Sequence, residues 1–242
     1  FRAEEAAARL VAIASGARDP RPLSQQRREL YRAQNDAAQS AMRNLTWHEV
    51  ARDELLDAAR NARLVLFGEM HHSDGPLREA QRAMLRAMAG AQPVVLGFEP
   101  SVQEAQQSVL DLAAQLGVEV RSTETNWRTL NANNQYAERD DETATAINTC
   151  LAEDPARRLF VLRGEGHTLP GGYLCRQLHE APLIVLTVHQ PLLCARGDRL
   201  QLAGRTFRIG DGKRLYFCGV DDLLESDPGL ATWLAERQRG GP

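Results

Sequence analysis

Short apolar runs recur along the middle of the chain, and most are bounded by glycine or charged residues. Runs of this length are typical of strands covered on both faces of a sheet. Between them, apolar residues spaced three or four apart predict helices over residues 77–88, 101–116 and 138–153. Strands and helices that alternate at this spacing indicate parallel pairing through right-handed crossovers. The predicted strands cover residues 64–67, 94–98, 118–120, 159–162 and 183–188.

The two ends of the chain carry different patterns. The first sixty residues are rich in Ala, Arg, Glu and Gln and predict helices that wrap the domain. Within them, the S/T-x-x-E form of residues 46–49 predicts a capping box that starts a helix running to Ala62. Near the other end, Asp211-Gly212 lies between Thr206–Ile209 and residues 214–217, which indicates an antiparallel hairpin.

Together these elements predict one domain of the α/β class, with a mixed, mainly parallel sheet flanked by helices and a C-terminal antiparallel hairpin. Its parts are a helical N-terminal extension, an α/β core, and a hairpin followed by a C-terminal helix. A second capping box, from Ser101 to Glu104, starts the helix after the second strand. The Asn-rich stretch 123–135 is expected to form a loop over a site. The three parts span residues 1–60, 61–190 and 191–242.

Composition and charge narrow the class of partner. Of the 242 residues, 43% are hydrophobic, which is enough for one core. The 29 basic and 32 acidic residues are mixed along the chain, so there is no basic block to bind phosphates, and nucleic acid is not expected. No apolar run approaches the roughly 20 residues of a membrane-spanning helix. The N-terminus shows no charged-then-apolar export pattern.

The four cysteines lie far apart in the sequence. Because no C-x-x-C pair is present, a structural zinc site is not expected. We interpret them as buried free thiols, although an even count leaves room for a disulfide in an oxidising compartment, for example between Cys194 and Cys218. The other two are Cys150 and Cys175.

Ionisable residues stand where three of the predicted strands end. Glu69 and His71 follow the first strand two residues apart, so their side chains can point the same way. Glu99 follows the second strand, and His167 ends a later one. The spacing Gly-x-x-His therefore occurs twice, each time soon after a run of apolar residues. Because the carboxyl ends of parallel strands border one crevice, we expect these four residues to converge on a single pocket.

Carboxylates and imidazoles together suit a divalent metal ion, and they equally suit acid–base work on a bound water. Arg139 and Asp140 open the helix before the second Gly-x-x-His, so they are expected to face the same crevice. There Arg139 could pair with Glu99 or hold an anionic substrate. The candidate metal ligands are Glu69, His71, Glu99 and His167.

Three further side chains are candidates for binding a cofactor. His72 follows directly on His71, and Tyr136 and Tyr173 flank the expected pocket. A tyrosine or histidine can ligate haem iron, although packing is the commoner use of an aromatic ring.

Four segments of the chain resemble the superfamily of ChaN-like, Tiki and TraB proteins, which also includes hydrolases of the erythromycin-esterase type. The first two are closest to the ChaN-like branch of haem- or iron-associated bacterial surface lipoproteins. The second Gly-x-x-His and the Glu-Arg-Asp helix are shared with Tiki and TraB relatives, where such residues imply a metal-dependent peptidase site. The segments are VLFGEMH at 65–71, VVLGFE at 94–99, ERD at 138–140 and FVLRGEGH at 160–167.

The resemblance implies a ChaN-like protein that binds haem or iron and is exported, either to the periplasm or as a membrane-anchored lipoprotein. The alternative that it implies is a hydrolase in which Glu69 or His71 activates water and His167 assists, with Arg139 or a metal stabilising the oxyanion. A third option is a non-catalytic binding or effector module. The expected partners are a small molecule, haem or a peptide, with a homodimer as a further option.

Two departures from the family pattern bear on this choice. The helix continues as Asp141-Glu142-Thr143-Ala144 where relatives have Met-Ala, and Glu165 adds a charge inside the second motif. The extra carboxylates favour a hard cation or an acid–base role over haem.

Overall fold

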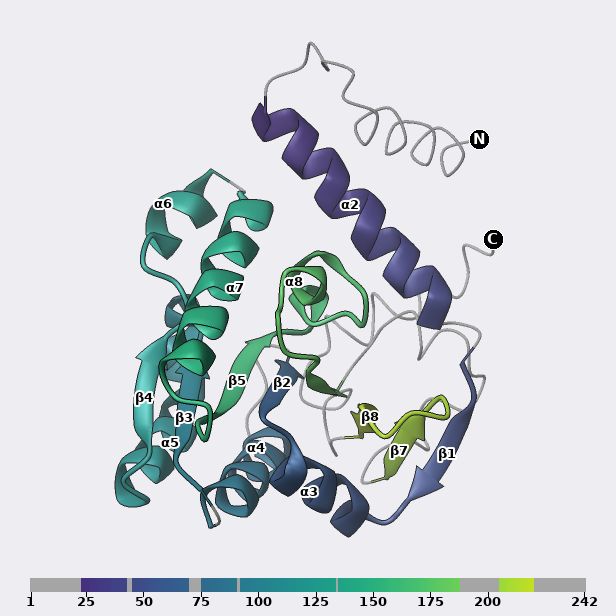
Figure 1. Ribbon diagram of the computed structural model, residues 1–242, viewed down its shortest axis with the longest axis vertical. Helices are drawn as coiled ribbons and strands as arrows, with labels where there is room; N and C mark the ends of the chain where they lie inside the picture. Colours follow the sequence, from purple (N-terminus) through teal and green to yellow (C-terminus); the bar gives the residue numbers. More distant parts are fainter. Residues whose placement is uncertain are drawn as a thin grey trace.

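A computed structural model describes residues 23–42, 45–69, 75–90, 92–133, 135–187 and 205–219. Eight strands of this part of the chain form one sheet in the order β1-β7-β8-β6-β2-β5-β3-β4 (Figure 1). The strands from β6 to β4 in that order pair in parallel, as does β8 with β6, whereas β7 is antiparallel to β8 and to β1. The strands are β1 (Trp47–Val50), β2 (Leu64–Glu69), β3 (Val94–Phe98), β4 (Glu119–Ser122), β5 (Arg158–Gly164), β6 (Leu183–Leu186), β7 (Thr206–Ile209) and β8 (Leu215–Cys218).

The helices fall into two packed groups. In one group α3 packs on α4 and α4 on α5; in the other, α7 packs on α2, α6 and α8. The predicted α/β class, the mainly parallel sheet and the C-terminal antiparallel pair are therefore confirmed. The helices are α2 (Leu23–Met42), α3 (Arg52–Asn61), α4 (Pro76–Ala89), α5 (Gln103–Gln115), α6 (Trp127–Ala132), α7 (Tyr136–Glu153) and α8 (Tyr173–Arg176), with 3₁₀ turns η1 (Pro100–Val102) and η2 (Glu165–His167).

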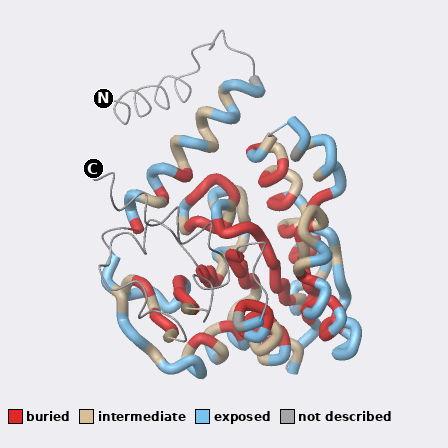
Figure 2. The backbone as a smooth tube through the Cα atoms, turned by 180° about the vertical axis from the view of Figure 1, so that it is seen from behind, coloured by how far each residue is buried: buried red, intermediate tan, exposed pale blue. Residues whose placement is uncertain are grey.

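The core lies along the central strands β2, β5 and β6, which are buried over their whole length (Figure 2). Phe67 of β2 and Phe160 of β5 meet edge to face, with ring centroids 6.1 Å apart. Continuous apolar runs predicted these strands because a strand covered on both faces has no polar side to alternate with. No helix in the described part of the chain is long and apolar enough to cross a membrane.

Two expected helix starts are wrong. Residues 47–50, predicted to begin a helix, form β1, which pairs with β7 and packs Trp47 on Phe207 and Phe217, with ring centroids 5.5 and 5.3 Å away. Ser101 is not a helix cap, since it lies in η1 and α5 begins at Gln103. Its hydroxyl donates instead to Glu99, at 2.8 Å. At residues 47–50 a tertiary strand pairing outweighs the local capping pattern, and at Ser101 a hydrogen bond to Glu99, two residues away, does so.

The Asn-rich stretch also differs from the expected loop, because residues 127–132 form α6, which packs on α7. The predicted C-terminal helix and residues 1–22 lie outside the described residues, as does Cys194, so the disulfide with Cys218 stays a prediction. Cys150 and Cys175 have free thiols, as expected.

A buried arginine fastens the amino edge of the sheet to two helix ends. Arg158, the first residue of β5, is 3% exposed and donates to the carbonyls of Ala59 and Ala62 at the end of α3 and of Met88 at the end of α4. The last carbonyls of a helix have no partner within the helix, so the guanidinium supplies donors that the helices lack.

We expect Arg158→Leu to lower the free energy of unfolding by about 2–4 kcal/mol, because it removes the guanidinium donors from three helix-end carbonyls, of which that of Ala59 keeps the amide of Ala62. Urea denaturation would measure the loss. Arg82→Ala is the matched control: its partner Glu79 is on the surface, and we expect a change within about 0.5 kcal/mol. Equal effects of the two substitutions would contradict the capping role.

Candidate functional site

The carboxyl ends of β3, β4 and β5 bring three buried charged residues together. Glu99 follows β3, Glu124 follows β4, and Arg163 is the penultimate residue of β5. Their exposed fractions are 2%, 2% and 0%. Neighbouring parallel strands end at the same edge of a sheet, which explains why residues 25 to 64 positions apart in sequence meet here.

Two guanidinium groups neutralise these carboxylates. Arg139, from the first turn of α7, pairs with Glu99 and lies 3.1 Å from Glu124, while Arg163 pairs with Glu124 and lies 3.8 Å from Glu99. The amide of Gly164 also donates to Glu99, at 3.1 Å. Arg139 was expected in the crevice, either paired with Glu99 or holding an anionic substrate, and the structure places it in contact with Glu99.

Asp140 links this ionic cluster to an imidazole. One carboxylate oxygen of Asp140 accepts from Arg163 at 3.1 Å and lies 2.7 Å from Nδ1 of His167. Asp140 is fully buried, whereas the His167 side chain is 13% exposed. A carboxylate at this distance favours the tautomer with its proton on Nδ1, in which Nε2 is the basic nitrogen.

Two tyrosines pack against this imidazole, and a third packs on one of them. Tyr31 of α2 and Tyr136 of α7 have ring centroids 6.4 and 6.2 Å from that of His167, and the Tyr31 hydroxyl lies 3.4 Å from Nδ1. Tyr173 of α8 packs on Tyr31 at 5.4 Å. Asn35 of α2 accepts a hydrogen bond from the Tyr173 amide at 2.9 Å, which ties the two helices together.

Burial shifts the pKa of several groups near His167. It raises the pKa of Tyr31, with the charge of Asp140 as a further cause, and it raises that of Tyr173, with Asp141 as a further cause. Both phenols therefore stay protonated at neutral pH. Burial also raises the pKa of Cys175 to about 12, so its thiol is not a nucleophile under ordinary conditions.

Glu69 belongs to a second buried cluster. Its carboxylate accepts from Arg78 at 2.5 Å and from Gln81, both on α4, and from Gln106 on α5 at 2.7 Å. Register explains the separation: Glu69 pairs with Gly164, so it projects to the opposite face of the sheet from Arg163, which pairs with Gly68. The structure thus brings together Glu99, Arg139, Asp140 and His167, and ties Glu69 to other helices.

Glu165, the extra charge of the second motif, links the turn after β5 to the end of β6, two strands away in the sheet. It accepts from the backbone amide of Thr187 at 3.0 Å, and the Thr187 hydroxyl donates to the carbonyl of Gly68 at 3.0 Å. A Cβ on Gly68 would lie 2.4 Å from the hydroxyl of Thr168, so this close approach of β2 to the turn after β5 requires glycine.

Some predicted residues lie elsewhere. His71 and His72 are outside the described residues, so their expected roles stay predictions. Tyr173 lies inside the cluster with its hydroxyl bound to Asp141 at 3.0 Å, whereas Tyr136 is 41% exposed. Within the described part of the chain, no group of three or more His, Cys, Asp or Glu residues has the arrangement of a metal site.

Sequence reasoning missed three members of the site: Glu124, Arg163 and Tyr31. An arginine inside the apolar run FVLRG does indicate a buried partner of opposite charge, since an unpaired charge is costly in a sheet covered on both faces. Nothing local marks Tyr31, because α2 reaches the site from 136 positions away.

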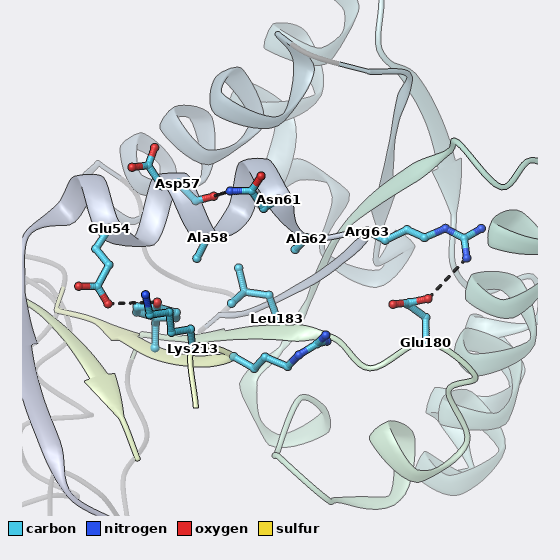
Figure 3. Close-up of a pocket in the computed structure, with 11 residues that line it drawn as sticks. Glu54, Asp57, Ala58, Asn61, Ala62, Arg63, Glu180, Leu183 and Lys213 are labelled. Atoms are coloured by element: carbon cyan, nitrogen blue, oxygen red, sulfur yellow. Dashed lines mark hydrogen bonds and ion pairs between the residues drawn. The ribbon is translucent and has the colours of Figure 1, made fainter. Parts of the chain in front are cut away.

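A separate groove of about 660 Å³ lies at the opposite, amino edge of the sheet (Figure 3). It is bordered by α3 and by the residues before β2, β6 and β8. Several of its ionic groups pair with one another or with neighbours: Arg63 lies 3.5 Å from Glu180, and Glu54 lies 2.9 Å from Arg208. The groove does not include the ionic cluster described above.

No family model, curated protein or solved structure matches this chain. The resemblance to ChaN-like, Tiki and TraB proteins therefore remains an expectation drawn from the sequence.

We expect Arg163→Met to lower the free energy of unfolding by about 3–5 kcal/mol, because it leaves buried carboxylates without their counter-charge. Urea denaturation would measure this loss. Adding Glu124→Gln, which removes one of those charges, should recover part of it. A double variant no more stable than the single one would contradict the charge-balance explanation.

Proposed function

We propose that this chain is a hydrolase in which His167 is the general base. The observation that carries the proposal is the 2.7 Å contact between Asp140 and Nδ1 of His167, with Asp140 itself fixed by Arg163. A buried carboxylate this close to Nδ1 favours one tautomer of the imidazole and stabilises the imidazolium that forms during proton transfer.

The reaction follows from this arrangement. Nε2 of His167 takes a proton from a water molecule as the water oxygen attacks the carbonyl carbon of an ester or amide. The imidazolium then returns that proton to the leaving oxygen or nitrogen as its bond to the carbonyl carbon breaks, which gives an acid and an alcohol or amine. Arg139 holds Glu99 and Glu124 in this scheme, so its role is to position the cluster.

The described carboxylates fit a divalent metal poorly. Glu69 and Glu99 each face a guanidinium group, of Arg78 and Arg139, and a metal ion would have to displace it or lie beside its positive charge. Asp140 holds the Nδ1 of His167. The proposed reaction therefore uses no metal.

We expect His167→Gln to lower kcat/KM for ester hydrolysis by about 10²- to 10⁴-fold, the usual contribution of a general base. The measurement is turnover of a panel of p-nitrophenyl esters by the purified protein, with circular dichroism to verify the fold. His179→Gln is the control, because His179 is exposed and lies after α8. Hydrolysis that persists in His167→Gln would refute the proposal.

Haem binding is a second candidate, favoured by the exposure of Tyr136. Of the two tyrosines proposed as iron ligands, Tyr173 fits poorly, because its hydroxyl donates to Asp141 and burial raises its pKa away from the phenolate form. Tyr136 fits better, since 41% of its surface is accessible and its ring packs on Tyr31.

For this candidate we expect added haemin to give a Soret band that is lost in Tyr136→Phe and kept in Tyr173→Phe, because only an accessible phenol can bind the iron. Absorption titration measures both. Wild-type protein that leaves the haemin spectrum unchanged would exclude the candidate.

A further inference from the structure

The side chain of Tyr136 is exposed and lies beside the imidazole of His167. The large apolar side chains that are exposed in the described part of the chain are those of Leu45, Leu116, Val120 and Tyr136. Leu116 follows α5, and Val120 lies in β4 at the edge of the sheet. Among these four, Tyr136 is the one whose ring contacts His167.

The ring of Tyr136 is held in place by neighbouring tyrosines. Tyr31 stacks behind it with ring planes 24° apart and centroids 6.5 Å apart, and Tyr173 packs in turn on Tyr31 at 5.4 Å. Tyr136 and Asp140 stand four residues apart on α7, so they share one face of the helix. Tyr136 packs on other rings and still has 41% of its surface exposed, and a ring restrained in this way loses little side-chain entropy when a ligand stacks on it.

The charge beside this surface is negative. Three buried carboxylates, of Glu99, Glu124 and Asp140, face two guanidinium groups, of Arg139 and Arg163. Among the described residues of this cluster the carboxylates outnumber the guanidinium groups by one. The second carboxylate oxygen of Asp140 is buried and accepts no hydrogen bond from the described part of the chain. An anionic ligand would be repelled here, whereas a neutral or cationic one would not.

We propose that Tyr136, supported by Tyr31, forms a stacking subsite for a neutral or cationic aromatic ring next to His167. The inference rests on the proposed function, since it names the substrate class of the same site: compounds whose hydrolysable bond lies beside an aryl or heteroaryl group. Tyr136 is then the residue that selects the substrate, and α2 contributes to that selection through Tyr31.

Binding of three naphthyl compounds tests the proposal without turnover. We would measure 2-naphthalenemethanol (neutral), 2-naphthylmethylamine (cationic) and 2-naphthoate (anionic) by NMR titration of the full chain. The neutral and cationic compounds should bind at least about tenfold more tightly than naphthoate. Naphthoate that binds as tightly as the other two would overturn the charge preference, and no binding of any compound would overturn the subsite.

Variants at Tyr136 distinguish the contribution of its ring to binding from that of its hydroxyl. Tyr136→Ala should weaken naphthyl binding by about three- to tenfold, the contribution of one aromatic contact, while Tyr136→Phe should bind as the wild type does. Leu116→Ala, which removes an exposed apolar side chain elsewhere, should have no effect. Unchanged binding in Tyr136→Ala, with thermal unfolding verifying its fold, would overturn the assignment.

The same experiment distinguishes this inference from the proposed function. His167→Gln removes the general base and leaves the tyrosine rings in place, so it should keep naphthyl binding. If naphthyl compounds bind through Tyr136 but no ester is hydrolysed, the subsite stands and the hydrolase proposal fails. If esters are hydrolysed through His167 but Tyr136→Ala binds the naphthyl compounds normally, the reverse holds.

Discussion

The buried charge of Arg163 is the constraint on which the carboxyl edge of the sheet depends. Burial by itself lowers the pKa of this guanidinium, but the charges of Glu99, Asp140 and Glu124 more than offset that effect, so its pKa stands above the ordinary value. Arg163 therefore stays charged inside the protein, and the carboxylates around it stay in reach of a fixed positive charge. Each partner comes from a different strand end or helix, so one side chain fixes the relative positions of β3, β4, β5 and α7.

The ionic cluster contributes more to the positions of the site residues than to the stability of the fold. Desolvating several charges is expensive, and an apolar core of the same volume is often at least as stable. The ionic cluster fixes the orientation of its side chains, because a carboxylate that accepts from a fixed guanidinium has little freedom to turn. Asp140 is held in this way, and it holds the imidazole of His167 in turn. The route from Arg163 to His167 is thus a chain of two short polar contacts.

Much of the fold could be predicted from the sequence, because it depends on the distribution of apolar residues. The strands β2, β3 and β5 and the helices α4 and α7 were predicted within a few residues, and so was the hairpin of β7 and β8. The errors have two causes: β1 pairs with a strand some 160 positions away, and Ser101 donates to Glu99, two residues before it, instead of capping α5. A local capping pattern carries no information about the distant partner of β1.

The candidate site, too, could be predicted only in part from the sequence. That Glu99 and His167 lie near strand ends could be predicted from spacing, since Glu99 directly follows an apolar run and His167 comes five residues after Leu162, the last apolar residue of another. Spacing does not show on which face a side chain emerges, and a shift of one residue along a strand reverses the face. Glu69 pairs with Gly164, one position beyond Arg163, and so it meets Arg78 of α4, whereas Arg163 meets Asp140 of α7. The two Gly-x-x-His motifs therefore contact different helices: Glu69 binds Arg78 of α4, whereas His167 lies against Asp140 of α7. Strand register determines which charges meet, together with residues that no local pattern marks.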